Sequence, residues 1–381
     1  MKRNIIILLT IVAVLTGCKN RTMNENPFLN ESYNTPFEVP PFDKIKAGHY
    51  KPAYLKGMEE HKKNVQAIIN KPQAPTFENT IKALEYSGEL LTKVSRVFGS
   101  LNSAHTNDTL QAINKEMAPL LARHRDDINL NDSLFRRVQQ VYENRDKFNL
   151  TGEEMKVLED TYKSFVRNGA ALSPEDKEKL RKINEELSLL TVRFSENLLA
   201  ETNAFKLILE REEELAGLPE GVRKQAASLA GNMGMEGKYV FTIQVPSMTP
   251  FLQYSDRRDL REKLFTAYFM KGDNDNERDT KDIIARIAKL RVERSKLLGY
   301  ENYASYVLER NMAKTPEKVF EFLSQIWDAA LPVAKAEAAA QQELINREGG
   351  KFKLAPWDWW YYSEKIKKEK YDLDDEITRP Y

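Results

Sequence analysis

An apolar stripe of helical period in residues 173–198 constrains the fold more than any other feature of the sequence. Ser173 suits the cap of a helix, and Pro174 falls at the first helical position, where its missing N–H costs nothing. Large apolar residues then recur every three or four positions, at Leu180, Ile183, Leu187, Leu190, Phe194 and Leu198. Because residues at this spacing share one helix face, the pattern predicts a long amphipathic helix that packs along other helices.

The same period dominates most of the chain. A helix is predicted to begin at the Thr76 cap and to carry one continuous apolar stripe, formed by Phe77, Ile81, Leu84, Leu91, Val94, Phe98 and Leu101. Further amphipathic segments lie at 110–124, 134–145, 153–166, 257–299 and 315–347. One stretch differs, since Lys238–Val245 is rich in β-branched and aromatic residues and predicts a short strand or hairpin. The sequence therefore predicts a mainly α fold.

The first residues have the pattern of an export signal. A basic start, Met1–Arg3, precedes an apolar stretch of eleven residues, Ile5–Leu15. As a helix these would span about 16 Å, too short for a bilayer core of about 30 Å. Leu-Thr-Gly-Cys at positions 15–18 resembles the bacterial lipobox, which predicts a lipoprotein signal peptide at 1–17 and lipid attachment at Cys18. The alternative is an ordinary secretory signal in which this cysteine has no role.

The segment that follows is expected to be a flexible tether. Residues 18–41 are polar and rich in asparagine and proline. Several acyl chains at Cys18 would anchor the protein stably. Lys19 follows the cysteine, where aspartate would indicate retention in the inner membrane. The expected location is therefore the bacterial cell envelope, on the outer membrane and facing the periplasm.

Composition and motif content exclude several classes of function. The 58 basic and 57 acidic side chains leave a net charge of +1, without the basic surplus that nucleic-acid binding requires. No P-loop, G-x-G-x-x-G or G-x-S-x-G motif occurs. Cys18 is the only cysteine, so a thiol nucleophile is not expected. The four histidines, His49, His61, His105 and His124, have no spacing typical of metal ligands.

Two local clusters leave alternatives open. Asp273–Asp279 superficially resembles a calcium loop, but it lacks the glycine at the sixth position and the distal glutamate. The aromatic run Trp357–Tyr362 holds three of the four tryptophans. It would either plug a seam between helical layers or offer Trp359, Tyr361 and Tyr362 as the lining of a peptide channel.

Several stretches in the same order resemble the zinc metallopeptidases of the thimet oligopeptidase and bacterial peptidyl-dipeptidase type. They are Pro75–Glu85, Leu290–Glu293, Leu297–Tyr300, Asn311–Pro316, Trp357–Lys365, Leu373–Glu376 and Arg379–Tyr381. The resemblance implies a multi-helical fold split by a deep channel, with oligopeptides as substrates and zinc as cofactor. It also implies an H-E-x-x-H helix that binds zinc together with a downstream glutamate, and release of dipeptides from a free C-terminus.

One departure from the family pattern bears on function. The sequence contains no H-E-x-x-H, and in the family this motif follows the stretches matched by Leu373–Glu376 and Arg379–Tyr381. The resemblance therefore implies the N-terminal portion of a family member, inactive alone, with no catalytic or zinc-binding residue. Its expected parts are an N-terminal helical lobe at 42–235, a hairpin and helical segment at 236–348, and an aromatic and acidic lead-in to the absent catalytic domain at 349–381. Apolar faces, including the aromatic run, should then be exposed.

The alternative hypothesis is a non-catalytic envelope lipoprotein. In that case the helical scaffold would bind a peptide or a partner protein, and zinc would have no role.

Overall fold

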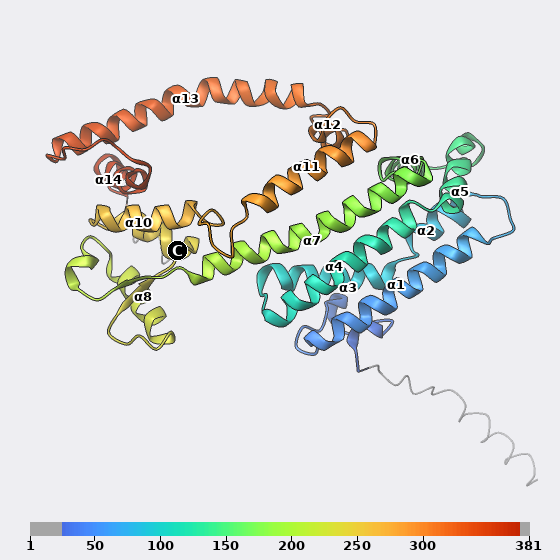
Figure 1. The fold of residues 1–381 in the computed structure, drawn as a ribbon, viewed down its shortest axis with the longest axis horizontal. Coiled ribbons are helices and arrows are strands. Elements are labelled where there is room, and N and C mark those ends of the chain that lie inside the picture. The colour runs from blue at the N-terminus through green and yellow to red at the C-terminus, as the bar shows by residue number, and fades with distance from the viewer. Residues whose placement is uncertain (1–24, 374–381) are drawn as a thin grey trace, which may run out of the picture. The chain divides into compact units, whose positions relative to one another are not determined.

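The structure, a computed structural model, describes residues 25–373 and is mainly helical (Figure 1). The chain divides into two compact units, and the boundary falls between Arg181 and Lys182 inside the long helix α7 (Pro174–Ala204). In the described part of the chain, the only sheet pairs two strands of three residues each. The predicted mainly α fold is confirmed, and the long helix begins at the predicted proline.

Unit 1 consists of helices packed around two apolar clusters. Its elements are α1 (Ala47–Ile69), α2 (Ala83–Glu85), α3 (Glu89–Ala104), α4 (Asp108–Asn129), α5 (Asp132–Glu143), α6 (Gly152–Arg167) and the first part of α7, with short helices at Pro27–Leu29, Pro36–Glu38, Phe77–Lys82 and Arg145–Lys147. Side-chain oxygens cap several of these helices: those of Asn107 and Asn131 accept hydrogen bonds from the backbone N–H groups of Leu110 and Leu134.

The helix predicted from Thr76 is broken, so the expectation of one continuous stripe was wrong. The Thr76 cap is confirmed, but a π-helical turn, Phe77–Lys82, and the short α2 end before α3 begins at Glu89. Because of the break, the apolar residues before it and those after it are buried in different clusters. Phe77 and Ile81 pack into the cluster around Leu134 and Leu158, whereas the later stripe residues Val94 and Phe98 pack around Tyr50.

A close approach between helices accompanies this break. A Cβ atom at Gly57 of α1 would lie 2.9 Å from the backbone nitrogen of Leu91, so only glycine lets α3 pack at this distance.

Part of the segment expected to be a tether is packed against unit 1. Phe28 is buried against the ring of Tyr50, with ring centroids 5.3 Å apart. The Asn26 side chain donates a hydrogen bond of 2.9 Å to the His49 carbonyl. The predicted signal peptide and Cys18 lie outside the described residues.

Unit 2 holds the sheet and the C-terminal helices. Its elements are the rest of α7, β1 (Leu207–Leu209), α8 (Glu220–Asn232), β2 (Tyr239–Phe241), α9 (Val245–Tyr254), α10 (Arg258–Phe269), α11 (Lys281–Leu297), α12 (Tyr303–Leu308), α13 (Pro316–Arg347) and α14 (Trp359–Tyr371), with 3-10 turns at Glu212–Leu215 and Pro356–Asp358. The largest apolar cluster among the described residues of this unit includes side chains of both strands and of α9 and α10, among them Phe241, Phe251 and Leu264.

The predicted strand is confirmed at Tyr239–Phe241, but it does not form a hairpin. Its antiparallel partner is β1, which lies upstream of α8, with Leu207 opposite Phe241 and Leu209 opposite Tyr239. Val245, expected at the end of the strand, instead begins α9. The domain boundaries expected at 235/236 and 348/349 stay predictions.

Within residues 25–373, no helix combines the length and the apolar character needed to cross a membrane.

Candidate functional site

The aromatic run surrounds a buried carboxylate, Asp358, whose side chain is 0% exposed. Arg258 donates to it through Nε at 3.1 Å and through Nη2 at 3.0 Å, and Arg261 donates through Nη2 at 2.8 Å. The backbone N–H of Ala355 adds a further hydrogen bond of 3.1 Å. The carboxylate is therefore fully satisfied, as a buried charge must be.

Local sequence explains why these groups converge. Arg258 and Arg261 stand three residues apart in α10 and so share a helix face. Pro356 opens the 3-10 turn that places Asp358 directly before α14. Arg261 is itself 1% exposed, and its Nη1 donates a hydrogen bond of 2.7 Å to the carbonyl of Ser255.

Tyr361 extends this arrangement to the turn before α10. Its ring lies 4.1 Å from the Arg261 guanidinium carbon, and its hydroxyl donates a hydrogen bond of 2.7 Å to Asp256. Burial, and after it the hydrogen bond to Asp256, raises the pKa of the Tyr361 hydroxyl above its ordinary value. We call Asp256, Arg258, Arg261, Asp358 and Tyr361 the Asp358 cluster.

The residues proposed to line a channel have different environments. Tyr361 and Tyr362 are buried and pack with Leu344 and Ile345 of α13, whereas Trp359 is half-buried. Burial also raises the pKa of the Tyr362 hydroxyl. A role for these three residues in lining a channel stays a prediction.

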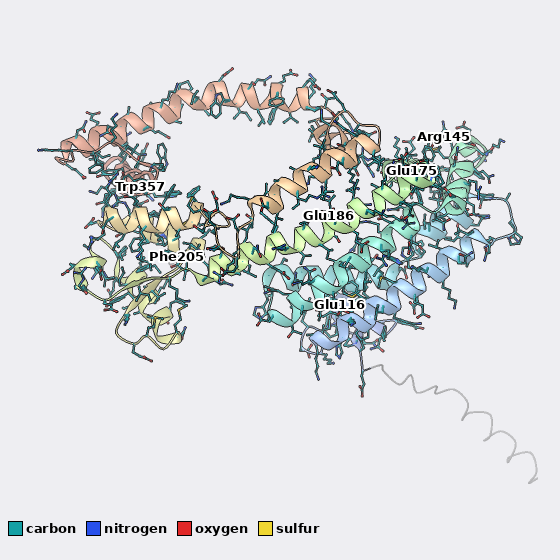
Figure 2. All side chains as sticks on the ribbon, in the orientation of Figure 1. Glu116, Arg145, Glu175, Glu186, Phe205 and Trp357 are labelled. Carbon is teal, nitrogen blue, oxygen red and sulfur yellow. The ribbon has the colours of Figure 1, made fainter. Side chains whose placement is uncertain are left out.

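Trp357 lies on the turn before α14 and beside α10 (Figure 2). The guanidinium carbon of Arg258 lies 5.4 Å from the centre of its ring, and Phe265 meets the ring edge-on with centroids 6.3 Å apart. Its buried indole N–H has no hydrogen-bond partner among the described residues.

The Asp358 cluster has a structural role. Both guanidinium groups and the carboxylate are engaged in hydrogen bonds and ion pairs, which leaves no group poised as a nucleophile or a general base. The arrangement fixes α14 and its tyrosines against α10. The Asp358 cluster was not predicted from the sequence. Arg258 and Arg261, three residues apart on an otherwise apolar helix face, could have indicated that a buried acidic partner lies beside this helix.

The described residues do not fit a zinc ion. Residues 25–373 contain no group of three or more histidine, cysteine, aspartate or glutamate side chains that could hold a metal. His49 instead caps the start of α1, where its Nδ1 accepts a hydrogen bond of 3.1 Å from the N–H of Lys46, and His105 is exposed.

The other two histidines form a pair inside unit 1, where α1 meets α4. His61 Nδ1 and His124 Nε2 lie 2.9 Å apart, so one ring donates to the other. The remaining ring nitrogen of His124 is buried without a partner in the described part of the chain. Burial, followed by the nearby His61 and Lys62, lowers the pKa of His124 to about 4, and burial also lowers that of His61.

This pair predicts that unit 1 loses stability in acid. Because the pKa of His124 is lower in the folded than in the unfolded state, its neutral ring stabilises the fold fully above about pH 6.5. That contribution is lost as the pH falls from about 6.5 towards 4, and we expect it to amount to about 2 to 3 kcal/mol.

Urea unfolding followed by circular dichroism between pH 7 and pH 4 measures this loss. His124→Gln should flatten the pH dependence, whereas the matched variant of the exposed histidine, His105→Gln, should leave it unchanged. An equal slope in both variants would contradict the assignment.

Comparison with known proteins identifies relatives along nearly the whole chain. The model described as peptidase family M3 matches residues 251–381. The dipeptidyl carboxypeptidase of Escherichia coli (strain K12) is 38% identical over 356 residues, which are 93% of this chain and 52% of that protein. That of Salmonella typhimurium is 36% identical, with shares of 94% and 53%. Oligopeptidase A of Escherichia coli is 31% identical, with shares of 93% and 52%.

The chain thus spans about half the length of the curated relatives that it matches. Similarity along both units, together with the family model over the segment that carries the Asp358 cluster, agrees with the resemblance seen in the sequence motifs. The chain belongs to peptidase family M3, the metallopeptidase family of thimet oligopeptidase and the peptidyl-dipeptidases.

Proposed function

We propose that this chain supplies the helical scaffold of a zinc-dependent peptidase that removes dipeptides from the C-terminus of oligopeptides. The observation that carries the proposal is that the chain is more similar to a dipeptidyl carboxypeptidase than to an oligopeptidase A. Over the same share of the chain, identity to the dipeptidyl carboxypeptidase of Escherichia coli is 38%, against 31% for oligopeptidase A of the same organism. Zinc is the cofactor of this family, and the described residues offer no donor set for it.

The part played by this chain is therefore structural. The Asp358 cluster holds α14 in place, and no step of hydrolysis is assigned to residues of the chain. Zinc ligands and the general base would come from an H-E-x-x-H segment, which the 381 residues do not contain. On this proposal the chain alone is inactive.

The proposal includes the location of the enzyme. Signal cleavage before Cys18 and acylation of its thiol would place the peptidase on the periplasmic face of the outer membrane, where it would act on exported oligopeptides. The support is the lipobox resemblance and the single cysteine at its required position.

The test uses the protein expressed from its native gene and purified from the cells that carry this gene. We expect it to release dipeptides from an oligopeptide with a free C-terminal carboxylate and to leave the matched C-terminal amide intact. A chelator should abolish the reaction and zinc should restore it. Equal cleavage of both peptides would contradict the assignment as a peptidyl-dipeptidase. No cleavage by the zinc-loaded protein would favour the alternative, a lipoprotein that uses the scaffold for binding.

A further inference from the structure

A short loop before α1 carries an almost fully exposed phenylalanine. The side chain of Phe37 is 99% exposed, the highest value among the large apolar side chains that the structure describes. Val39 and Phe42 follow it closely, and both are about half exposed. Single exposed apolar residues are ordinary, but three within six positions form an apolar patch that indicates an interaction site. We call Phe37, Val39 and Phe42 the Phe37 patch.

The backbone of the loop holds Phe37 in this position against a local preference. Phe37 and Glu38 have positive φ angles of 56° and 55°. This left-handed conformation is unfavourable for a residue with a Cβ atom, so it persists only where other contacts impose it. The Glu38 carboxylate accepts hydrogen bonds of 2.6 Å from the Ser32 hydroxyl and 2.8 Å from the Tyr33 N–H. These bonds close the loop and leave the Phe37 ring at its surface.

The chain directly before the loop is fixed to unit 1. Besides the contacts of Asn26 and Phe28 described above, the Lys93 ammonium donates a hydrogen bond of 3.1 Å to the Asn30 carbonyl. The same ammonium lies 4.0 Å from the centre of the Tyr33 ring. The Phe37 patch is therefore carried by unit 1 and is not on a free tail.

The proposed acylation site lies a short distance away along the chain. Cys18 precedes Asn26, whose side chain bonds to α1, by eight positions. An extended chain covers at most about 3.6 Å per residue, so these positions span no more than about 29 Å. An acylated Cys18 would therefore keep this part of unit 1 close to the bilayer surface.

The chemistry of the patch and its neighbours suits a lipid surface. Apolar side chains that enter a bilayer interface are commonly flanked by lysines, which pair with the phosphate groups of the lipids. Lys44 and Lys46, both exposed, follow the patch, with one exposed acid, Asp43, beside them. We propose that the Phe37 patch inserts into the headgroup region of the bilayer that holds the acyl anchor and thereby orients unit 1 on the membrane. This inference rests on the proposed acylation of Cys18 and not on the proposed peptidase activity.

Site-specific photocross-linking tests the proposal on the protein expressed from its native gene, in the cells that carry this gene. The photoreactive amino acid p-benzoylphenylalanine replaces Phe37, whose exposure makes the change harmless to the core. The matched control is Val166, an apolar residue of α6 that is 40% exposed. Its neighbour Phe165 packs with Ile68 at the C-terminal end of α1, whereas the loop precedes the N-terminal end. Attachment of phospholipid should be about tenfold greater from position 37.

Mass spectrometry of the purified protein identifies what is attached to each position and whether Cys18 carries acyl groups. Phospholipid on the peptide that contains position 37, at the expected excess, supports the proposal. An acylated protein with equal or no phospholipid at the two positions, or with a protein attached at position 37, would overturn it and leave the proposed location standing. A Cys18 without acyl groups would overturn the proposed location and this inference with it. Neither readout depends on peptide hydrolysis.

Discussion

Replacing Asp358 with alanine is expected to destabilise unit 2 by about 3 to 5 kcal/mol. The variant leaves Arg261, which is 1% exposed, without its carboxylate, and it removes the acceptor of three hydrogen bonds from Arg258. Losing one member of a buried ion pair costs far more than the intact pair contributes, because the remaining charge stays desolvated.

Tryptophan fluorescence can follow the unfolding of unit 2 separately from that of unit 1. Trp327, Trp357, Trp359 and Trp360 all belong to unit 2, so tryptophan fluorescence during urea unfolding reports that unit alone. The matched control is Asp259→Ala, which breaks the exposed pair with Arg257 and should cost less than about 1 kcal/mol.

A second substitution tests the physical cause. If the loss comes from an unpaired buried charge, Arg261→Met added to Asp358→Ala should recover part of it, since the methionine removes one desolvated charge. Asp358→Ala within about 1 kcal/mol of the native protein, or no recovery in the double variant, would contradict this account of the cluster.

The helices were predictable because their signals are local. Caps such as Thr76 and Ser173 and the period of the apolar stripes determine where most helices lie, and both caps accept backbone hydrogen bonds as expected. The break before α3 was not predictable. It depends on the close approach of α1 at Gly57 and on two separate cores, which no local pattern encodes.

Non-local pairing explains the other differences. β1 is three residues long and meets β2 only after α8 has intervened, so its own sequence carried too little signal. The Asp358 cluster joins residues about one hundred positions apart. The expectation that the aromatic run is exposed was wrong, because Tyr361 and Tyr362 are buried and Trp357, Trp359 and Trp360 are half-buried. Large exposed apolar side chains lie on α13 instead.

A second prediction concerns the binding of zinc by this chain. The chain has one cysteine and four histidines, and two of those histidines are committed to each other at 2.9 Å. A catalytic zinc site needs three protein ligands that converge on one point, and residues 25–373 provide no such group. If the proposed function is right, this chain is therefore expected not to hold a catalytic zinc ion on its own.

The zinc content and peptidase activity of the purified chain test this central claim most directly. After incubation with zinc and removal of the excess, we expect much less than one zinc per chain. We also expect no cleavage of an oligopeptide with a free C-terminus. One tightly bound zinc per chain, with cleavage abolished by a chelator and restored by zinc, would contradict the account.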